Sequence, residues 1–255
     1  MILKIALISD LHSNREALEA VGQHIERQGI ERIFCLGDVV GYAAEPEFCI
    51  DFVRERAEIC LMGNHDEAVL HDASDFNAHA RGAIEFTKKR MKPAWYSGAE
   101  KKARWNWLAS LPLKHRLGRF LFVHGSPRDP VREYVLSTDG FLNPDKLVGI
   151  FKSFESVALG GHTHHPGMHD ETMRFSGLDG AECLSMEIPS KGKSFINVGS
   201  VGQPRDGDNR ACYAVLEEDV ITWHRVAYDF TATMKKIMDT GSLSKILASR
   251  LQIGK

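Results

Sequence analysis

Eight side chains that can bind metals or transfer protons follow short apolar runs in this sequence. They stand shortly after the runs rather than inside them, at five separate places along the chain. Carboxylate, carboxamide and imidazole groups bind transition metals, and imidazole also transfers protons. One such residue after an apolar run is usually a turn or cap residue, but five places with the same chemistry indicate a shared site. The residues are Asp10, His12, Asp38, Asn64, His65, His124, His162 and His164.

The apolar runs before these residues are typical of strands that are buried on both faces. The first three runs alternate with two stretches of helical spacing. The first stretch follows a potential cap at Ser13 or Asn14, and the second has Pro46 in its first turn. Because parallel strands place their carboxyl ends at one edge of a sheet, this alternation would bring the polar residues together. The three runs span residues 3–8, 32–36 and 58–62.

The second half of the chain consists mostly of short strand-like runs, with a helix predicted at residues 145–154. We therefore expect an α/β fold in which two mixed β-sheets pack as a sandwich flanked by helices. We interpret residues 1–255 as a single domain, with a helical insertion at about 72–110 and a C-terminal helix at about 242–252 that docks on the protein's own core. The later strands are predicted at residues 120–123, 157–159, 183–188, 194–198, 211–216 and 220–226.

The five groups of polar residues resemble, in order and spacing, the motifs of the calcineurin-like metallophosphoesterase superfamily. The pattern of that family is D-x-H, G-D-x-x, G-N-H-[DE], H and G-H-x-H. The segment at residues 197–206 is further similar to its small bacterial phosphodiesterase-like branch. The resemblance implies a four-layered fold over most of the chain. The matching residues are Asp10-Leu11-His12, Gly37-Asp38-Val39-Val40, Gly63-Asn64-His65-Asp66, His124 and Gly161-His162-Thr163-His164.

The resemblance also implies a role for each matching residue. Two sets of ligands would hold two divalent or trivalent transition-metal ions (Mn, Fe or Zn), and Asp38 would belong to both sets. His65 would stay off the metals and face the substrate, where it would donate a proton to the leaving oxygen or hydrogen-bond the developing charge. The first ion would be held by Asp10, His12, Asp38 and His164, and the second by Asp38, Asn64, His124 and His162.

A pair of such ions supports phosphoester hydrolysis by a metal-activated hydroxide. We expect the substrate to be a phosphodiester of a small organic or nucleotide compound, with a phosphomonoesterase as the alternative. A protein phosphatase is disfavoured, because Val39 and Val40 follow Asp38 where the phosphoprotein phosphatases of the family continue toward a phosphate-gripping arginine. A scaffold without catalysis is a third interpretation, and it is disfavoured because the ligands and His65 are all present.

Three further residues have two interpretations each. Asn14 would contact substrate phosphate or only cap the first helix, and Arg205 would contact substrate or brace the metal loop. Asp66 would orient His65 or cap the segment that follows it. Substrate specificity is expected to come from the loop around Tyr42 and from residues 72–110 and 166–193. His169, in the last of these segments, is expected at the surface.

Composition excludes several other classes of protein. The 255 residues include 32 basic and 34 acidic side chains, and this formal net charge of −2 favours neither a stable nucleic-acid complex nor binding to an anionic membrane. No apolar stretch reaches the length of a membrane span. Five cysteines without a C-x-x-C motif indicate reduced thiols and a cytoplasmic location. A small phosphate ester is the expected partner, and the sequence leaves the oligomeric state open.

Overall fold

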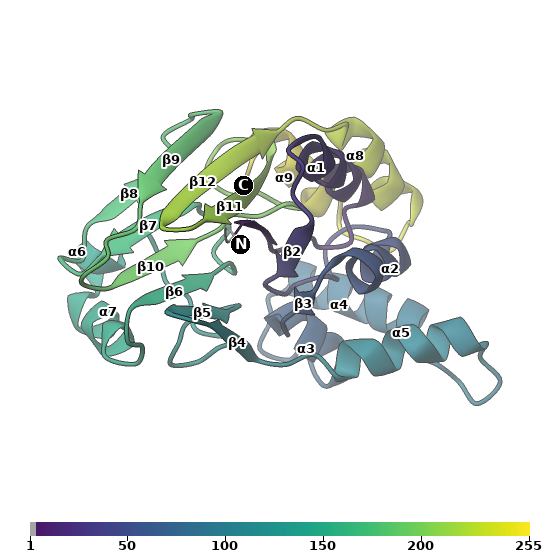
Figure 1. Cartoon of the computed structure of the whole chain (residues 1–255). Coiled ribbons are helices and arrows are strands. Elements are labelled where there is room, and N and C mark those ends of the chain that lie inside the picture. Colours follow the sequence, from purple (N-terminus) through teal and green to yellow (C-terminus); the bar gives the residue numbers. More distant parts are fainter. Residues whose placement is uncertain (1–3) are drawn as a thin grey trace.

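A computed structural model describes residues 4–255, whose strands form two six-stranded sheets (Figure 1). The first sheet has the order β3-β2-β1-β11-β12-β9, and the second has the order β4-β5-β6-β10-β7-β8. The strands of the first sheet are β1 (Lys4–Ile8), β2 (Arg32–Cys35), β3 (Ile59–Cys60), β9 (Cys183–Glu187), β11 (Ala211–Glu217) and β12 (Val220–Val226). Those of the second are β4 (Lys114–Leu117), β5 (Phe120–Val123), β6 (Val157–Gly160), β7 (Gly167–Asp170), β8 (Phe175–Gly177) and β10 (Ser194–Asn197). Residue 3, where the first strand was predicted to begin, lies outside the described residues.

Both sheets are mixed, as predicted. β1 pairs in parallel with β2 and antiparallel with β11, and β10 pairs in parallel with β6 and antiparallel with β7. Strand β1 is buried on both faces because its side chains alternate with period two. Ile5 and Leu7 point into the core between the two sheets, where Phe122 and Trp223 are also buried. Ala6 and Ile8 point the other way, into the core beneath the helices.

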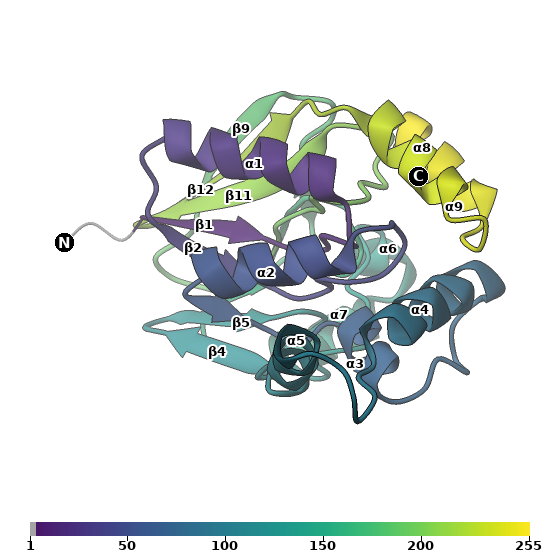
Figure 2. The ribbon, with the colours of Figure 1, turned by 90° about the vertical axis from the view of Figure 1, so that its right-hand side faces the viewer.

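Helices cover the outer faces of both sheets, which gives the four layers that the family resemblance implied. Figure 2 shows α1 (Arg15–Arg27) and α2 (Pro46–Arg56) along the outer side of the first sheet. Their buried residues, such as Leu18 and Ile50, pack in one cluster with residues of β1 and β2. On the second sheet, α7 (Pro144–Phe151) packs against Ala158 and Phe195. A short helix, α6 (Asp139–Leu142), precedes it.

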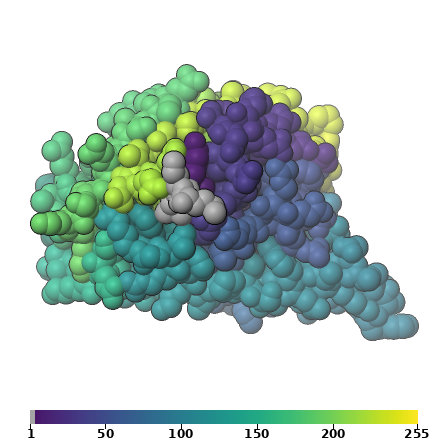
Figure 3. All heavy atoms as spheres, viewed as in Figure 1, coloured from purple at the N-terminus to yellow at the C-terminus, as the bar shows by residue number. Residues whose placement is uncertain are grey.

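The region predicted as a helical insertion contains two helices and follows a third. These are α3 (Asn64–Leu70), α4 (Ala78–Met91) and α5 (Ala99–Ala109). Figure 3 shows that the part of the chain joining α4 to α5 projects from the body of the molecule. Trp95, in this connection, is 89% exposed. No helix among residues 4–255 has the length and apolar character that crossing a bilayer requires.

The C-terminal segment forms two helices, α8 (Phe230–Asp239) and α9 (Lys245–Ile253). The sequence predicted α9 but not α8. Leu247 and Leu251 of α9 are buried against Tyr42 and against Ala83 of α4. The last helix therefore docks on the chain's own core and brings the end of the chain to the loop that follows β2.

Candidate metal centre

The proposed ligands follow their strands in a backbone conformation that is uncommon for residues with a side chain. Asp10, His12, Asp38, His162 and His164 have φ angles between 48° and 66°. Non-glycine residues in this left-handed region are strained, and such residues cluster at functional sites. The tight turns that result aim the side chains at one another from the ends of strands β1, β2 and β6.

Two glycines of the motifs allow the backbone to pass directly beside the carboxylates. A Cβ atom at Gly63 would lie 2.1 Å from the backbone nitrogen of Asp38, and one at Gly161 would lie 2.4 Å from Oδ2 of Asp10. No side chain fits at these separations. The space is used for hydrogen bonds instead. The backbone amide of His65 donates to Oδ1 of Asp38 over 2.8 Å, and that of His162 donates to Oδ2 of Asp10 over 3.0 Å.

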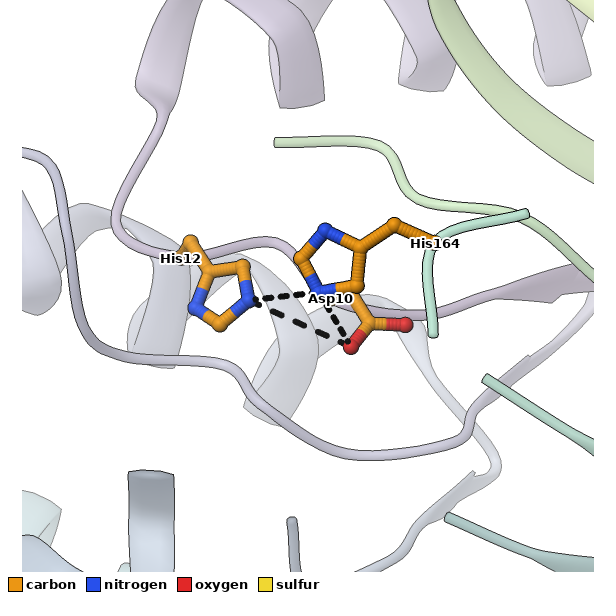
Figure 4. Close-up of side chains that lie close together, drawn as sticks. All are labelled: Asp10, His12 and His164. Carbon is orange, nitrogen blue, oxygen red and sulfur yellow. Dashed lines mark hydrogen bonds and ion pairs between the residues drawn. The ribbon is translucent and has the colours of Figure 1, made fainter. Parts of the chain in front are cut away.

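Asp10, His12 and His164 form the first cluster of metal-binding groups, and Figure 4 shows their side chains pointing toward one another. Nε2 of His164 lies 3.1 Å from Oδ1 of Asp10 and 3.2 Å from Nε2 of His12. Nε2 of His12 lies 3.9 Å from the same carboxylate oxygen. All three side chains are buried. The geometry thus gathers three of the four residues that were expected to hold the first ion.

Asp38 joins this cluster to a second one. Its Oδ2 lies 3.6 Å from Nε2 of His12 and 3.5 Å from Nε2 of His124. Asp38, His124 and His162 have ligand atoms within 4.8 Å of one another, and Oδ1 of Asn64 lies 3.1 Å from Nε2 of His124. Asp38 therefore occupies the position between two donor sets that the sequence assigned to it.

Backbone carbonyls fix the tautomer of each histidine in the two clusters. A carbonyl oxygen only accepts, so the ring nitrogen facing it carries a proton, and the other nitrogen can offer a lone pair to a metal ion. Nδ1 of His12, His124 and His164 donates to the carbonyls of Val40, Leu36 and Gln203, over 3.3, 2.9 and 2.5 Å respectively. Nε2 of His162 donates to the carbonyl of Arg132 over 3.1 Å. This arrangement orients imidazole rings for metal binding.

The charges of the buried carboxylates also fit a cation. Burial raises the pKa of Asp10, but the imidazole of His164 outweighs this effect and holds the pKa below its usual range. Burial acts in the same way on Asp38, and the imidazoles of His124 and His65 hold its pKa well below the usual range. Two ionised carboxylates thus lie away from solvent among imidazoles and an amide. Such a donor set suits Mn, Fe or Zn ions.

His65 lies at the edge of both clusters. Its ring is buried between His12, Tyr42 and Phe76, with centroid distances of 4.8, 4.5 and 5.1 Å. Its Nδ1 is buried and has no hydrogen-bond partner among residues 4–255. Since His12, Asp38 and His65 also have ligand atoms within 4.8 Å of one another, the geometry permits either metal binding or proton donation by His65. Its assignment as the proton donor stays a prediction.

Asp66 links two loops of the centre. Its carboxylate accepts hydrogen bonds from the backbone amides of Val39, Val40 and Gly63, over 3.3, 3.1 and 3.1 Å. Burial, reinforced by the charge of Asp38, raises the pKa of this carboxyl to about 7. Of the two interpretations from the sequence, these bonds favour the cap, because Asp66 holds the start of α3 against the loop that carries Asp38.

A cavity of about 440 Å³ lies beside the two clusters. Tyr42 and residues 75–80 line it, as expected, whereas none of its lining residues comes from residues 166–193. The walls include residues of the 128–136 loop and of α9 that the sequence analysis did not identify. The lining residues are Tyr42, Asn64, His65, Asp75, Phe76, Asn77, Ala80, Arg132, Tyr134, His162, Arg205, Arg250 and Lys255.

The two tentative substrate residues lie in different environments. Arg205 lines the cavity and donates through Nη2 to the hydroxyl of Tyr42 over 3.1 Å. Asn14 does not line it. The Oδ1 of Asn14 caps α1 by accepting from the amide of Ala17, and its Nδ2 donates to the carbonyl of Gly202 over 2.8 Å. These bonds use the polar atoms of Asn14 within the fold and favour its interpretation as a cap, and its contact with substrate stays a prediction.

His169 is also placed differently from the prediction. It is buried rather than at the surface, because β7 pairs with β10 inside the second sheet. Its Nε2 donates to the carbonyl of Leu136 over 3.1 Å. This bond ties β7 to the loop that carries Tyr134 into the cavity.

Comparison with known proteins decides the family. A family model described as the calcineurin-like phosphoesterase superfamily domain matches residues 3–220. The chain belongs to this family. It is 36% identical over 260 residues to the uncharacterized protein MJ0912 of Methanocaldococcus jannaschii, with 98% of each chain covered. The crystal structure of a metallophosphoesterase from Sphaerobacter thermophilus superimposes with a TM-score of 0.84 at 34% identity, covering both chains completely. Protein PH1004 of Pyrococcus horikoshii shares the fold, with a TM-score of 0.74 at 17% identity over 99% of this chain and 98% of its own.

Membership of the calcineurin-like phosphoesterases confirms the resemblance found in the sequence. Together with the buried aspartate and histidine clusters, it identifies the protein as a metal-dependent phosphoesterase in general terms. The family is also consistent with divalent metal ions as cofactors.

Proposed function

We propose that the protein is a dinuclear metal-dependent phosphodiesterase acting on a small organic or nucleotide substrate. The observation that carries this proposal is the position of Asp38, whose Oδ2 lies 3.6 Å from one ligand histidine and 3.5 Å from another, belonging to the two clusters. A carboxylate has two oxygens and can link two cations, which makes it a suitable shared ligand. The cavity beside the clusters is lined by Asn64 and His162 of the second donor set and by His65, which would give a substrate access to the centre.

The residues that would hold the ions are those whose lone pairs converge. Asp10, His12 and His164 would bind one ion, His124, His162 and Asn64 the other, and Asp38 both. When bound, two such ions lower the pKa of a coordinated water for attack on phosphorus and polarise the phosphoryl oxygens.

His65 would donate a proton to the leaving oxygen. Its ring lines the cavity beside the clusters, and its Nδ1 has no hydrogen-bond partner among the residues that the structure describes. The rings of Tyr42 and Phe76 hold the imidazole from two sides and exclude water from it. A proton delivered in this way stabilises the charge that develops as the ester bond breaks.

A phosphomonoesterase is the second candidate, and Arg205 is the observation that favours it. This guanidinium lines the cavity and its Nε has no partner among the described residues, so it could bind the second charge of a monoester. The diester is preferred because Val39 and Val40 follow Asp38, so that no arginine next to the metal ligands grips a terminal phosphate.

Hydrolysis of bis-p-nitrophenyl phosphate tests the proposal, with p-nitrophenyl phosphate as the monoester comparison. Protein loaded with Mn²⁺ or Zn²⁺ is expected to contain two ions per chain by elemental analysis and to cleave the diester faster. Faster cleavage of the monoester would favour the second candidate. Full metal loading without turnover of either ester would contradict both enzymatic candidates and favour a scaffold.

The remaining expectations from the sequence are part of the same proposal. All five cysteines are free thiols, which supports a reducing compartment such as the cytoplasm. The partner is a small phosphate ester, without a stable nucleic-acid complex or membrane attachment. The oligomeric state is left open.

A further inference from the structure

Three basic side chains line the cavity without a carboxylate to neutralise them. They come from separate parts of the chain: Arg205 from the loop after β10, Arg250 from α9, and Lys255 from the end of the chain. Within residues 4–255, no carboxylate lies within ion-pair distance of any of the three. Asp75 is the one acidic side chain among the lining residues outside the metal clusters.

Several other arginines of the chain have carboxylate partners. Arg132, which lines the same cavity, is neutralised by Glu67 over 2.8 Å. Arg210 pairs with Asp208 over 2.6 Å, and Arg104 pairs with Asp51. A guanidinium that is partly withdrawn from water without a counter-ion is unfavourable. The concentration of unneutralised cations in one concave site therefore indicates an anionic ligand.

The cavity holds Arg205 in a fixed orientation. Its Nη2 donates to the Tyr42 hydroxyl over 3.1 Å and to Oε1 of Gln203 over 3.0 Å, while its buried Nε has no partner. The charges of Arg205 and Arg250 both act on the Tyr42 hydroxyl and lower its pKa, against the raising effect of burial. Both guanidinium groups line the same cavity. Paired guanidinium groups bind phosphate oxygens with directed, charge-assisted hydrogen bonds.

Aromatic rings provide an apolar surface next to these cations. Tyr134 stacks on His162 with a centroid distance of 3.8 Å, and its side chain is still partly exposed to the cavity. Phe76 also lines the cavity and packs against His65. An organic ring system between phosphate groups would thus have a place to pack. The volume of about 440 Å³ suits a substrate of nucleotide size.

We infer that Arg205, Arg250 and Lys255 form a second anion subsite, and that the substrate is an organic phosphate ester whose non-reacting half carries a further phosphate group. The scissile phosphate lies at the metal clusters and the further phosphate lies at this subsite. The inference rests on the proposed function and narrows its substrate class. It predicts a higher kcat/KM for an ester that carries a second phosphate group than for the same ester without it.

A matched pair of chromogenic substrates tests the inference. The p-nitrophenyl ester of thymidine 5′-phosphate has one phosphate, and the same ester with an added 3′-phosphate has two. With Mn²⁺-loaded protein, the added phosphate is expected to raise kcat/KM about tenfold or more, the size of a charge-assisted contact to phosphate. In Arg250→Gln, the ratio of the two kcat/KM values is expected to fall below about threefold. Lys245→Gln, on the same helix but exposed and outside the cavity, removes the same charge and should keep the wild-type ratio.

Binding to the metal-free protein provides a second measurement that needs no turnover. Thymidine 3′,5′-bisphosphate should bind the wild type by calorimetry, and Arg250→Gln should weaken its Kd about tenfold while Lys245→Gln does not. Equal kcat/KM values for the two esters would contradict the anion subsite but would still support phosphodiesterase activity. Equal effects of the two substitutions would also overturn it, since net charge would then be the cause. No turnover of either ester would contradict the proposed function, and the calorimetry would still decide the subsite.

Discussion

The floor and the wall of the cavity are built in opposite ways. The floor consists of the metal-binding side chains, which are buried at the ends of strands and fixed by backbone hydrogen bonds, as His12 is by the carbonyl of Val40. The wall consists of half-exposed side chains such as Arg250 and Tyr134, from segments far apart in the chain. The proposed metal ligands are therefore held in the buried core of the fold, whereas the residues proposed to recognise substrate lie on segments at its surface.

The comparison predicts its largest effect for Asp38, which belongs to both donor sets. Asp38→Asn keeps the size of the side chain but removes the charge shared between the two clusters. Elemental analysis should show at most one ion per chain, and kcat/KM for bis-p-nitrophenyl phosphate should fall by about 10⁴-fold or more, because each ion contributes several kcal/mol to catalysis. A variant that still held two ions would refute the shared position.

His65 separates catalysis from metal binding within the floor. His65→Ala should lose about 10³-fold in kcat, within the range for removal of a general acid. Its metal content should equal that of the wild type. If the ions were lost together with activity, His65 would be a ligand, as its proximity to His12 and Asp38 also permits.

Removal of the metal ions should lower the stability of the folded protein. Ions that bind only the folded state stabilise it by about 2.7 kcal/mol each at a hundredfold excess over Kd. Because 1 kcal/mol shifts the Tm of a chain of this size by about 2–4 °C, treatment with a chelator should lower the Tm by about 10–20 °C. Calorimetry with and without the chelator measures this shift. If the Tm stayed unchanged after confirmed loss of both ions, metal binding would not stabilise the fold.

A substitution that disturbs the wall should change substrate binding without changing metal content, and Asp139 offers a test. This buried carboxylate accepts from the amide of Leu136 over 2.8 Å and pairs with Lys146 over 2.6 Å, which holds the loop that follows Tyr134. Asp139→Asn should lower the free energy of unfolding by about 2 kcal/mol, since it weakens a buried charged pair. It should raise KM more than it lowers kcat, with metal content unchanged. Loss of ions in this variant would show that floor and wall are not independent.

Asn14 should give the smallest effect. Its side chain caps α1 and lies outside the cavity, so Asn14→Ala should cost about 1–2 kcal/mol of stability, as the loss of a cap does. Chemical denaturation measures this cost. KM for the diester is expected to stay at its wild-type value. A raised KM with unchanged stability would favour the substrate contact over the cap.

The floor could be predicted from the sequence because each of its parts has a local signature. The buried strands are short apolar runs, and the ligands are identified by residue type directly after them, as with Asp38 after β2. The glycines of the motifs also have a local cause. The backbone at Gly63 passes so close to Asp38 that no side chain fits there. Strand β12 was predicted with its observed limits, Val220–Val226.

The missed elements lack such signatures. Strand β4 is formed by Lys114–Leu117, an edge strand of mostly polar residues that shows no buried face. Helix α8 is an exception: Phe230, Met234 and Ile237 stand at helical spacing and pack in one cluster, and the sequence analysis overlooked this pattern. Arg250 and Lys255 resemble ordinary surface cations in the sequence. They become part of the wall only because α9 packs against Tyr42, a contact between positions more than 200 residues apart that no local pattern encodes.

The docking of α9 has a practical consequence for handling the protein. Lys255 lines the cavity, and its amide donates to the carbonyl of Arg250 over 3.3 Å, so any peptide fused after it would begin at the substrate entrance. An affinity tag at that end would compete with substrate and distort kinetic measurements. Purification handles for assays of this enzyme therefore belong at the amino end or should be cleaved before use.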